Sequence, residues 1–158
     1  MALQTSYNDT QPVAVVGAQA TMIPATIISR TVEGAAIPFG KAVSQGADEK
    51  GCKAFGGADT AIVGITLLDR SAAGTTVVNG QVTARTPDTF GVGESARIIT
   101  KGDIWVTASV AVNAGDPVFV IPATGAFAKT NASSAVQIAG ARWDTTTTVA
   151  GLAVVRLA

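Results

Sequence analysis

The chain contains no histidine among its 158 residues. Imidazole is the most frequent side-chain general base at neutral pH, and it completes the Ser-His-Asp and Cys-His nucleophilic sites. It is also a ligand in nearly all common zinc and iron sites. Its absence therefore excludes these active sites and metal centres, and an enzyme would need paired carboxylates or a lysine nucleophile instead.

Carboxylates are scarce too, with eight Asp and three Glu. Asp103 and Asp116 each follow a glycine, while Asp69, Asp88 and Asp144 lie at the ends of apolar runs. Asp is common at such places because its side chain hydrogen-bonds the backbone of a turn. We therefore predict turn roles for these residues, no catalytic residue, no metal site and no cofactor, and a protein that is not an enzyme.

Only one cysteine is present, so no disulfide forms within the chain and no CxxC metal site exists. Cys52 follows a segment rich in glycine and charge, and we interpret residues 45–59 as a solvated surface loop that contains it. Residues 1–7 lack the basic and apolar regions of a signal peptide. The longest uncharged stretch, residues 10–29, is interrupted by prolines, which disfavours a membrane-spanning helix. We expect a soluble cytoplasmic product with no membrane partner.

Charge of either sign is also low. Charged residues make up 14% of the chain, and 11 basic residues balance 11 acidic ones; typical domains have about 25%. Phosphate binding draws on clustered Lys and Arg, and no basic run exists here, so we expect no nucleic-acid partner. A surface this poor in charge suits a protein that buries its exterior against neighbours, although some stable β domains are simply uncharged.

What the chain has in abundance is residues that favour strands. Val, Ile and Thr together supply 50 residues, whereas Leu supplies only five. Short β-like runs separated by Gly and Pro predict an all-β fold, a single compact β-barrel or jelly-roll-like domain. The runs are residues 26–32, 37–43, 61–68, 75–78, 81–84, 96–100, 104–111, 117–121, 136–142 and 148–157.

Two turns between these runs have hairpin signatures. Asn79-Gly80 suits a two-residue type I′ turn between residues 75–78 and 81–84. Residues 101–103 (KGD) separate two other β-like runs by three residues. We predict a hairpin at both places.

The first 25 residues differ from the rest, because Asp9 is the only charged residue before Arg30 and the apolar positions follow no sustained period. We predict an extended N-terminal arm over residues 1–25 and a β-barrel or sandwich body over residues 26–158. The alternative is an ordinary edge strand with a poorly ordered start. Apolar and aromatic side chains of the arm are candidate interaction residues, namely Tyr7, Val13, Val15, Val16, Met22 and Ile23.

Trp105 is the remaining candidate for an interaction. It lies between Ile104 and Val106, and in an alternating strand it points to the opposite face from both. Trp105 is therefore either a core anchor or an anchor of an interface.

Several short sequence motifs along the chain carry a resemblance through their order and spacing. They are residues 37–43 (IPFGKAV), 64–65 (GI), 96–106 (ARIITKGDIWV), 115–120 (GDPVFV) with 124–125 (TG), and 140–143 (GARW) followed by 151–156 (GLAVVR). Together these phrases resemble the small structural cement proteins that decorate the heads of tailed bacteriophages. The resemblance covers most of the chain from about residue 30.

The resemblance implies a capsid decoration protein of the virion. Its barrel or jelly-roll-like body would sit on the outer surface of the capsid, form a homo-oligomer, either a trimer or a dimer, and tie neighbouring major capsid protein subunits together. Synthesis would take place in the cytoplasm of the host bacterium. The resemblance implies no catalysis and no cofactor.

Two other functions stay open at this point. One is another structural component of the virion, in a tail or a head fibre. The other is a small-ligand or carrier β-barrel module, because residues 112–120 are similar to hairpins of lipoyl and biotinyl carrier domains. Carriers need a modifiable lysine at a hairpin tip, and Lys101 lies near the second predicted tip but lacks the flanking residues of those motifs.

Overall fold

The computed structural model describes residues 13–70, 75–78, 81–84, 86–132 and 134–158. These residues form strands and turns, and the described ranges contain no helix that could cross a membrane. The strands are β1 (Thr26–Val32), β2 (Ile37–Pro38), β3 (Ala42–Gln45), β4 (Gly51–Ala54), β5 (Gly64–Thr66), β6 (Thr75–Val78), β7 (Gln81–Ala84), β8 (Thr89–Phe90), β9 (Ser95–Ala108), β10 (Pro117–Ile121), β11 (Ala126–Ala128), β12 (Val136–Trp143) and β13 (Gly151–Leu157).

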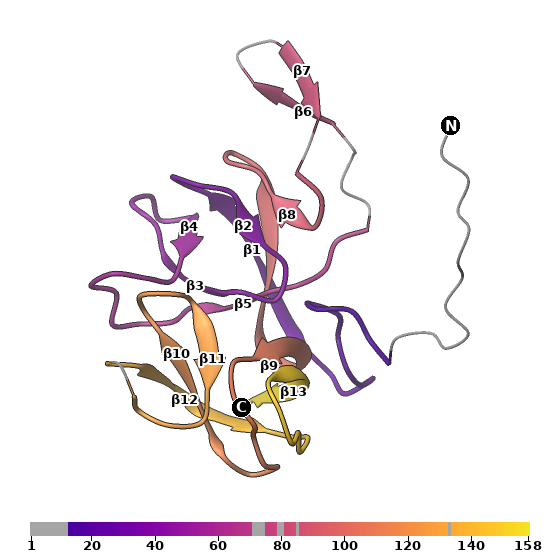
Figure 1. The fold of residues 1–158 in the computed structure, drawn as a ribbon. Coiled ribbons are helices and arrows are strands. Elements are labelled where there is room, and N and C mark those ends of the chain that lie inside the picture. Colours follow the sequence, from indigo (N-terminus) through magenta and orange to yellow (C-terminus); the bar gives the residue numbers. More distant parts are fainter. Residues whose placement is uncertain (1–12, 71–74, 79–80, 85, 133) are drawn as a thin grey trace.

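The long strand β9 organises the fold (Figure 1). The nine-stranded sheet has the order β1-β4-β3-β5-β9-β11-β10-β12-β13, and the extra pairings β1–β9 and β9–β13 close it twice onto β9. We call β1-β4-β3-β5-β9 the first ring and β9-β11-β10-β12-β13 the second ring. The predicted all-β barrel fold is confirmed, and its unpredicted feature is that two closed rings share one strand.

β9 belongs to both rings because its two halves have different partners. In the first half, Ile99 pairs with Ile27 of β1 on one edge and with Ile65 of β5 on the other. In the second half, residues from Gly102 to Ala108 pair with β13, and Ala108 also pairs with Phe127 of β11. Neighbouring residues of a strand point to opposite faces, so Ile98 and Ile99 are buried on opposite faces of β9, whereas Arg97, Lys101 and Thr107 stay exposed.

The core contains two apolar clusters, and β9 contributes to both. Val32, Phe39 and Ile98 belong to a smaller apolar cluster in which the rings of Phe39 and Phe90 meet edge to face, with centroids 5.0 Å apart. Ile99, the next residue of β9, belongs to a larger cluster that includes Ala42 and Ile65 of the first ring and extends through the second ring. Val, Ile and Ala dominate both clusters, which is why the strand propensity of the sequence was informative.

The predicted hairpin at residues 101–103 is wrong, because β9 runs without interruption from Ser95 to Ala108. Gly102 has a φ of 124°, and a Cβ there would lie 2.9 Å from the Cβ of Ala25. The glycine therefore permits an irregular strand and a close backbone approach where β9 changes partners, rather than a reversal of the chain.

The predicted loop over residues 45–59 is partly wrong. It contains β4, which pairs antiparallel with β3 and parallel with β1, where Cys52 lies opposite Val32. Cys52 is fully buried, so it is a core residue and not a loop residue. Residues 46–50 do form a turn, in which the amide N–H groups of Ala47 and Asp48 donate to the Glu33 carboxylate.

The other predicted hairpin is confirmed by its flanking strands. β6 and β7 pair antiparallel, and Val78 lies opposite Gln81. The turn residues Asn79 and Gly80 themselves lie outside the described residues.

Candidate interaction surface

Residues 17–20 lie along one edge of β9 and form a short extended segment within their own chain. The Gly17 N–H donates to the Trp105 carbonyl over 2.8 Å, the Trp105 N–H donates to Ala18 over 2.9 Å, and the Ala20 N–H donates to Asp103 over 3.1 Å. Gln19 forms an antiparallel bridge with Ile104. The segment occupies the edge of β9 opposite β13, so this part of the predicted arm contributes to the wall of the second ring.

Gly17 fixes this segment to the first ring as well. Its carbonyl accepts a 2.8 Å hydrogen bond from the Leu68 N–H, and its φ is 83°. A Cβ at Gly17 would lie 2.9 Å from the Cβ of Phe39, and a Cβ at Gly40 would lie 2.4 Å from Val16. Only glycine satisfies both the backbone conformation and the space at position 17.

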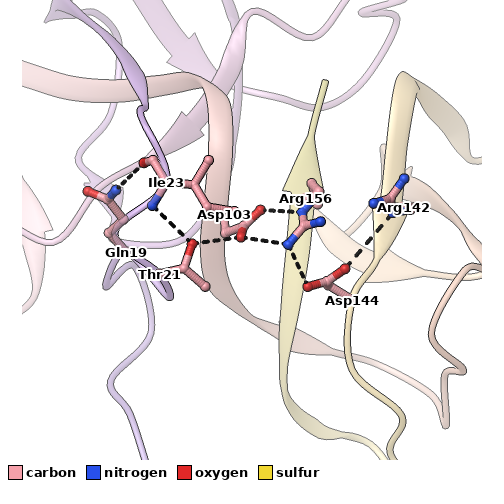
Figure 2. Close-up of polar contacts among 7 residues, drawn as sticks. All are labelled: Gln19, Thr21, Ile23, Asp103, Arg142, Asp144 and Arg156. Atoms are coloured by element: carbon pink, nitrogen blue, oxygen red, sulfur yellow. Dashed lines mark hydrogen bonds and ion pairs between the residues drawn. The ribbon is translucent and has the colours of Figure 1, made fainter.

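A charged cluster joins Thr21 of the arm to the second ring (Figure 2). Asp103 on β9 is 1% exposed, and the Arg156 guanidinium on β13 donates to its two oxygens over 2.8 and 3.0 Å. The Thr21 hydroxyl donates to the same carboxylate over 2.8 Å. Arg156 also reaches Asp144 over 2.9 Å, and Arg142 lies 3.9 Å from Asp144. The turn role predicted for Asp103 is therefore wrong.

The environment of Asp103 stabilises its charged form. Hydrogen bonds from Arg156 lower the pKa of Asp103 most strongly, burial opposes them, and the Thr21 hydroxyl lowers that pKa further. In turn, the hydrogen bond to Asp103 raises the pKa of Arg156. A carboxylate whose partners are all supplied by its own chain is suited to holding strands together, because bidentate charge-assisted hydrogen bonds fix geometry.

The predicted interaction residues differ in exposure. Val13 and Met22 are almost fully exposed, at 88% and 101%, and Val15 and Ile23 are exposed at 41% and 42%. Val16 is partly buried over Gly40. We call the four exposed side chains the arm patch. These side chains expose large apolar groups to solvent just before and just after the anchored segment in the sequence, and they are candidates for contact with a partner.

Trp105 and Tyr7 complete the predicted set. Trp105 is partly buried, whereas its neighbours Ile104 and Val106 are fully buried on the other face of β9. Tyr7 lies outside the described residues. The role of all seven side chains in an interface stays a prediction.

The sequence reasoning missed the charged cluster. Asp103 and Arg156 are 53 positions apart, and no local pattern pairs them. The available signal was that Asp103 and Arg156 each lie beside apolar residues within a strand, where an unpaired charge is unfavourable. In the described part of the chain, no group of three His, Cys, Asp or Glu side chains is arranged to hold a metal ion.

Comparison with known proteins places the chain in a family. Residues 3–158 match the sequence pattern of the structural cement proteins typified by E217 gp24 and Pam3 gp6. The chain belongs to this family of phage structural proteins, and the resemblance inferred from the sequence phrases is confirmed. Its role is therefore structural, in the capsid of a phage particle.

One solved structure has the same fold. A chain from the capsid of Myoviridae phage XM1 superposes with a TM-score of 0.73 at 18% sequence identity, covering 99% of this chain and 98% of that one. The head fibre gp8.5 N base of bacteriophage phi29 gives a TM-score of 0.44 at 11% identity, covering 85% and 95%. No curated protein matches the sequence.

Proposed function

We propose that this protein is a capsid decoration protein that binds the outer surface of the assembled shell and stabilises it by bridging neighbouring major capsid protein subunits. Membership of the structural cement family over residues 3–158 is the observation that carries the proposal. The exposed arm patch supports it, because four large apolar side chains in solvent gain free energy when a partner covers them.

In this proposal, the protein stabilises the shell because it binds the assembled form preferentially. A protein that binds the closed shell better than separated subunits lowers the free energy of the intact shell at every occupied site. A site that contacts two or more capsid subunits also gains avidity through effective concentration, so weak single contacts give stable occupancy. No catalytic group and no cofactor is needed.

We propose further that the protein acts as a homo-oligomer, a trimer or a dimer, after synthesis in the host bacterial cytoplasm. The arm of residues 1–25 and Trp105 would supply contacts to the neighbouring copy or to the capsid. The low charge of the chain supports this, since little desolvation of charge opposes such contacts.

The carrier function loses its candidate lysine. Lys101 lies inside β9 and pairs with Thr26 of β1, so it does not stand at a hairpin tip. A role in a tail or head fibre is separated from decoration by the place of the protein on the particle. Cryo-electron microscopy of particles that contain this chain should show density for its two rings over the whole outer shell, whereas density only at a vertex or tail would contradict the proposal.

A further inference from the structure

A groove lies where β12 and β13 separate. It has a volume of about 310 Å³ and is lined by residues of β12, β13 and the segment leading into β5. The lining residues are Thr60, Ala61, Ile62, Val63, Gly64, Thr100, Gln137, Ile138, Ala139, Leu157 and Ala158. None of the residues of the charged cluster lines the groove, although Leu157 in the lining directly follows Arg156.

Two stretches of backbone beside the groove have no strand along them. β12 pairs with β10 on one edge, but its pairing with β13 involves only Arg142 and Trp143. Residues 136–140 of β12 therefore leave one edge unpaired among the described residues. On the opposite wall, residues 60–62 form no backbone hydrogen bond within the described chain, whereas Val63 donates to Val43.

These edges also lack the usual protection. Proteins guard an exposed strand edge with charged side chains, proline, or a covering segment, because unpaired N–H and C=O groups recruit other strands. None of the residues that line the groove has a charged side chain, and none is proline. An uncharged edge of this kind is suited to being covered by an extended segment.

We propose that the first residues of a second copy of this chain occupy the groove and add a strand to the free edge of β12. The first eight residues contain no charged side chain and no proline, which matches a groove whose lining has no charged side chain. Leu3, Thr5 and Tyr7 alternate with Gln4 and Ser6, so a strand through them would present the larger side chains to one face. This inference rests on the self-association included in the proposed function.

The geometry favours a neighbouring copy over the same copy. Figure 1 shows the start of the described chain on the right of the body and β12 on the left. The Val15 carbonyl accepts a hydrogen bond from the Ala18 N–H and Val16 packs over Gly40, so only the residues before Val15 set the reach of the segment. The fourteen residues before Val15 span at most about 45 Å when extended. A body of this size has a diameter of roughly 40 Å, and a path over its surface from one side to the other is about 60 Å, so the segment falls short of its own groove but can reach that of an adjacent copy.

Cysteine pairing between two variants tests the proposal. A copy carrying Leu3→Cys, Thr5→Cys or Tyr7→Cys is mixed with a copy carrying Gln137→Cys and oxidised mildly, both in solution and on shells. Gln137 is exposed, and the native Cys52 thiol is buried with a raised pKa, so it does not compete. At least one mixture should give a species of twice the chain mass that reductant separates. The matched control replaces Gln137→Cys with Thr107→Cys, an exposed position on β9 outside the groove.

Each outcome decides the inference. Linkage to Gln137→Cys without linkage to Thr107→Cys supports the inference. If the wild-type chain then fails to decorate shells, that failure contradicts only the proposed decoration function. Decorated shells with no linkage in any of the three mixtures overturn the inference and leave decoration standing. A chain that carries both Tyr7→Cys and Gln137→Cys is oxidised in parallel. Linkage found only within that chain overturns the inference as well, because the segment would then fill its own groove.

Discussion

Asp103 and Arg156 lie directly opposite each other on β9 and β13, and two hydrogen bonds of 2.8 and 3.0 Å join the carboxylate to the guanidinium. The Thr21 hydroxyl completes the coordination of Asp103, so a residue of the N-terminal segment shares the carboxylate with the barrel. The stability of the second ring and the attachment of the arm are therefore coupled through one buried charge.

Removing the Arg156 cation from this pair should lower the free energy of unfolding. Arg156→Leu leaves Asp103 buried without its main partner, and we expect a loss of about 3 kcal/mol in the free energy of unfolding, since breaking a buried ion pair on one side costs about 3–5 kcal/mol. The lower figure applies because the Arg156 side chain is 32% exposed.

Urea unfolding at neutral pH measures this loss, with Arg142→Leu as the control. Arg142 lies 3.9 Å from Asp144 and is 53% exposed, so its removal should change stability by less than about 1 kcal/mol. Equal losses for the two variants would show that the Asp103 pair contributes no more than a surface pair.

The free energy of unfolding should also depend on pH. Hydrogen bonds lower the folded-state pKa of Asp103, from Arg156 first, and of Asp59, from Lys53 first. A carboxyl whose pKa is lower in the folded state stabilises the protein above its unfolded pKa of about 3.9, and that contribution disappears as pH falls through the folded value. We expect the urea midpoint to be constant near pH 6 and to fall below about pH 4.

Asp103→Asn should make this acid dependence shallower, because the variant lacks one of the two carboxyl groups, Asp103 and Asp59, whose lowered pKa is described above. The measurement is the urea midpoint at intervals from pH 7 to pH 2.5 in both proteins. Curves of identical slope below pH 4 would contradict the assignment to Asp103.

Gly17→Ala should weaken the attachment of residues 17–20. The substitution strains a φ of 83° and places a methyl group 2.9 Å from Phe39. Gly34→Ala is the matched control, since Gly34 has a φ of 77° but a Cβ there meets nothing within 4 Å.

The conformational cost of a left-handed residue, about 1–2 kcal/mol, is common to both glycine variants. Gly17→Ala should therefore be the more destabilised, by about 1 kcal/mol or more from the steric contact alone. Hydrogen exchange of the Ala20 and Trp105 amides should accelerate in Gly17→Ala only. Indistinguishable variants would mean that the segment is not packed as described.

The arm patch should matter for binding and not for folding. Met22→Ser and Ile23→Ser change exposed side chains, so the free energy of unfolding should stay within about 0.5 kcal/mol. Affinity for shells should fall about tenfold or more for each, because burying such a side chain contributes about 1.5–3 kcal/mol. Val92→Ser, at an exposed valine in the turn before β9, is the control. Unchanged affinity in the first two variants would show that the patch is not a contact.

The sequence predicted best what local preferences determine. The bounds of β1 and β10 agree with the predicted runs because β-branched residues there are flanked by Gly, Pro or Ala-rich turns. β4 was missed because Gly51 and Lys53 have low strand propensity, and the strand exists through pairing with β1 and β3 on both sides. Gly102 was misread because glycine marks an irregular strand as well as a turn.

The candidate site depended on contacts between distant parts of the chain. The exposed apolar residues of the arm were recognisable, since little charge surrounds them in the sequence. The anchoring of Gly17 on Trp105 and the groove beside β12 were not, because both depend on which strand edges the closed rings leave free. Local patterning does not encode which edge stays uncovered.

The rise in shell stability on binding tests the central claim most directly. Purified protein is added at increasing concentration to shells that lack it, and the temperature of shell disruption is followed by light scattering. A ligand selective for the assembled state must raise that temperature until the sites are saturated. We expect such a saturable rise, and an unchanged disruption temperature at saturating protein would contradict the account.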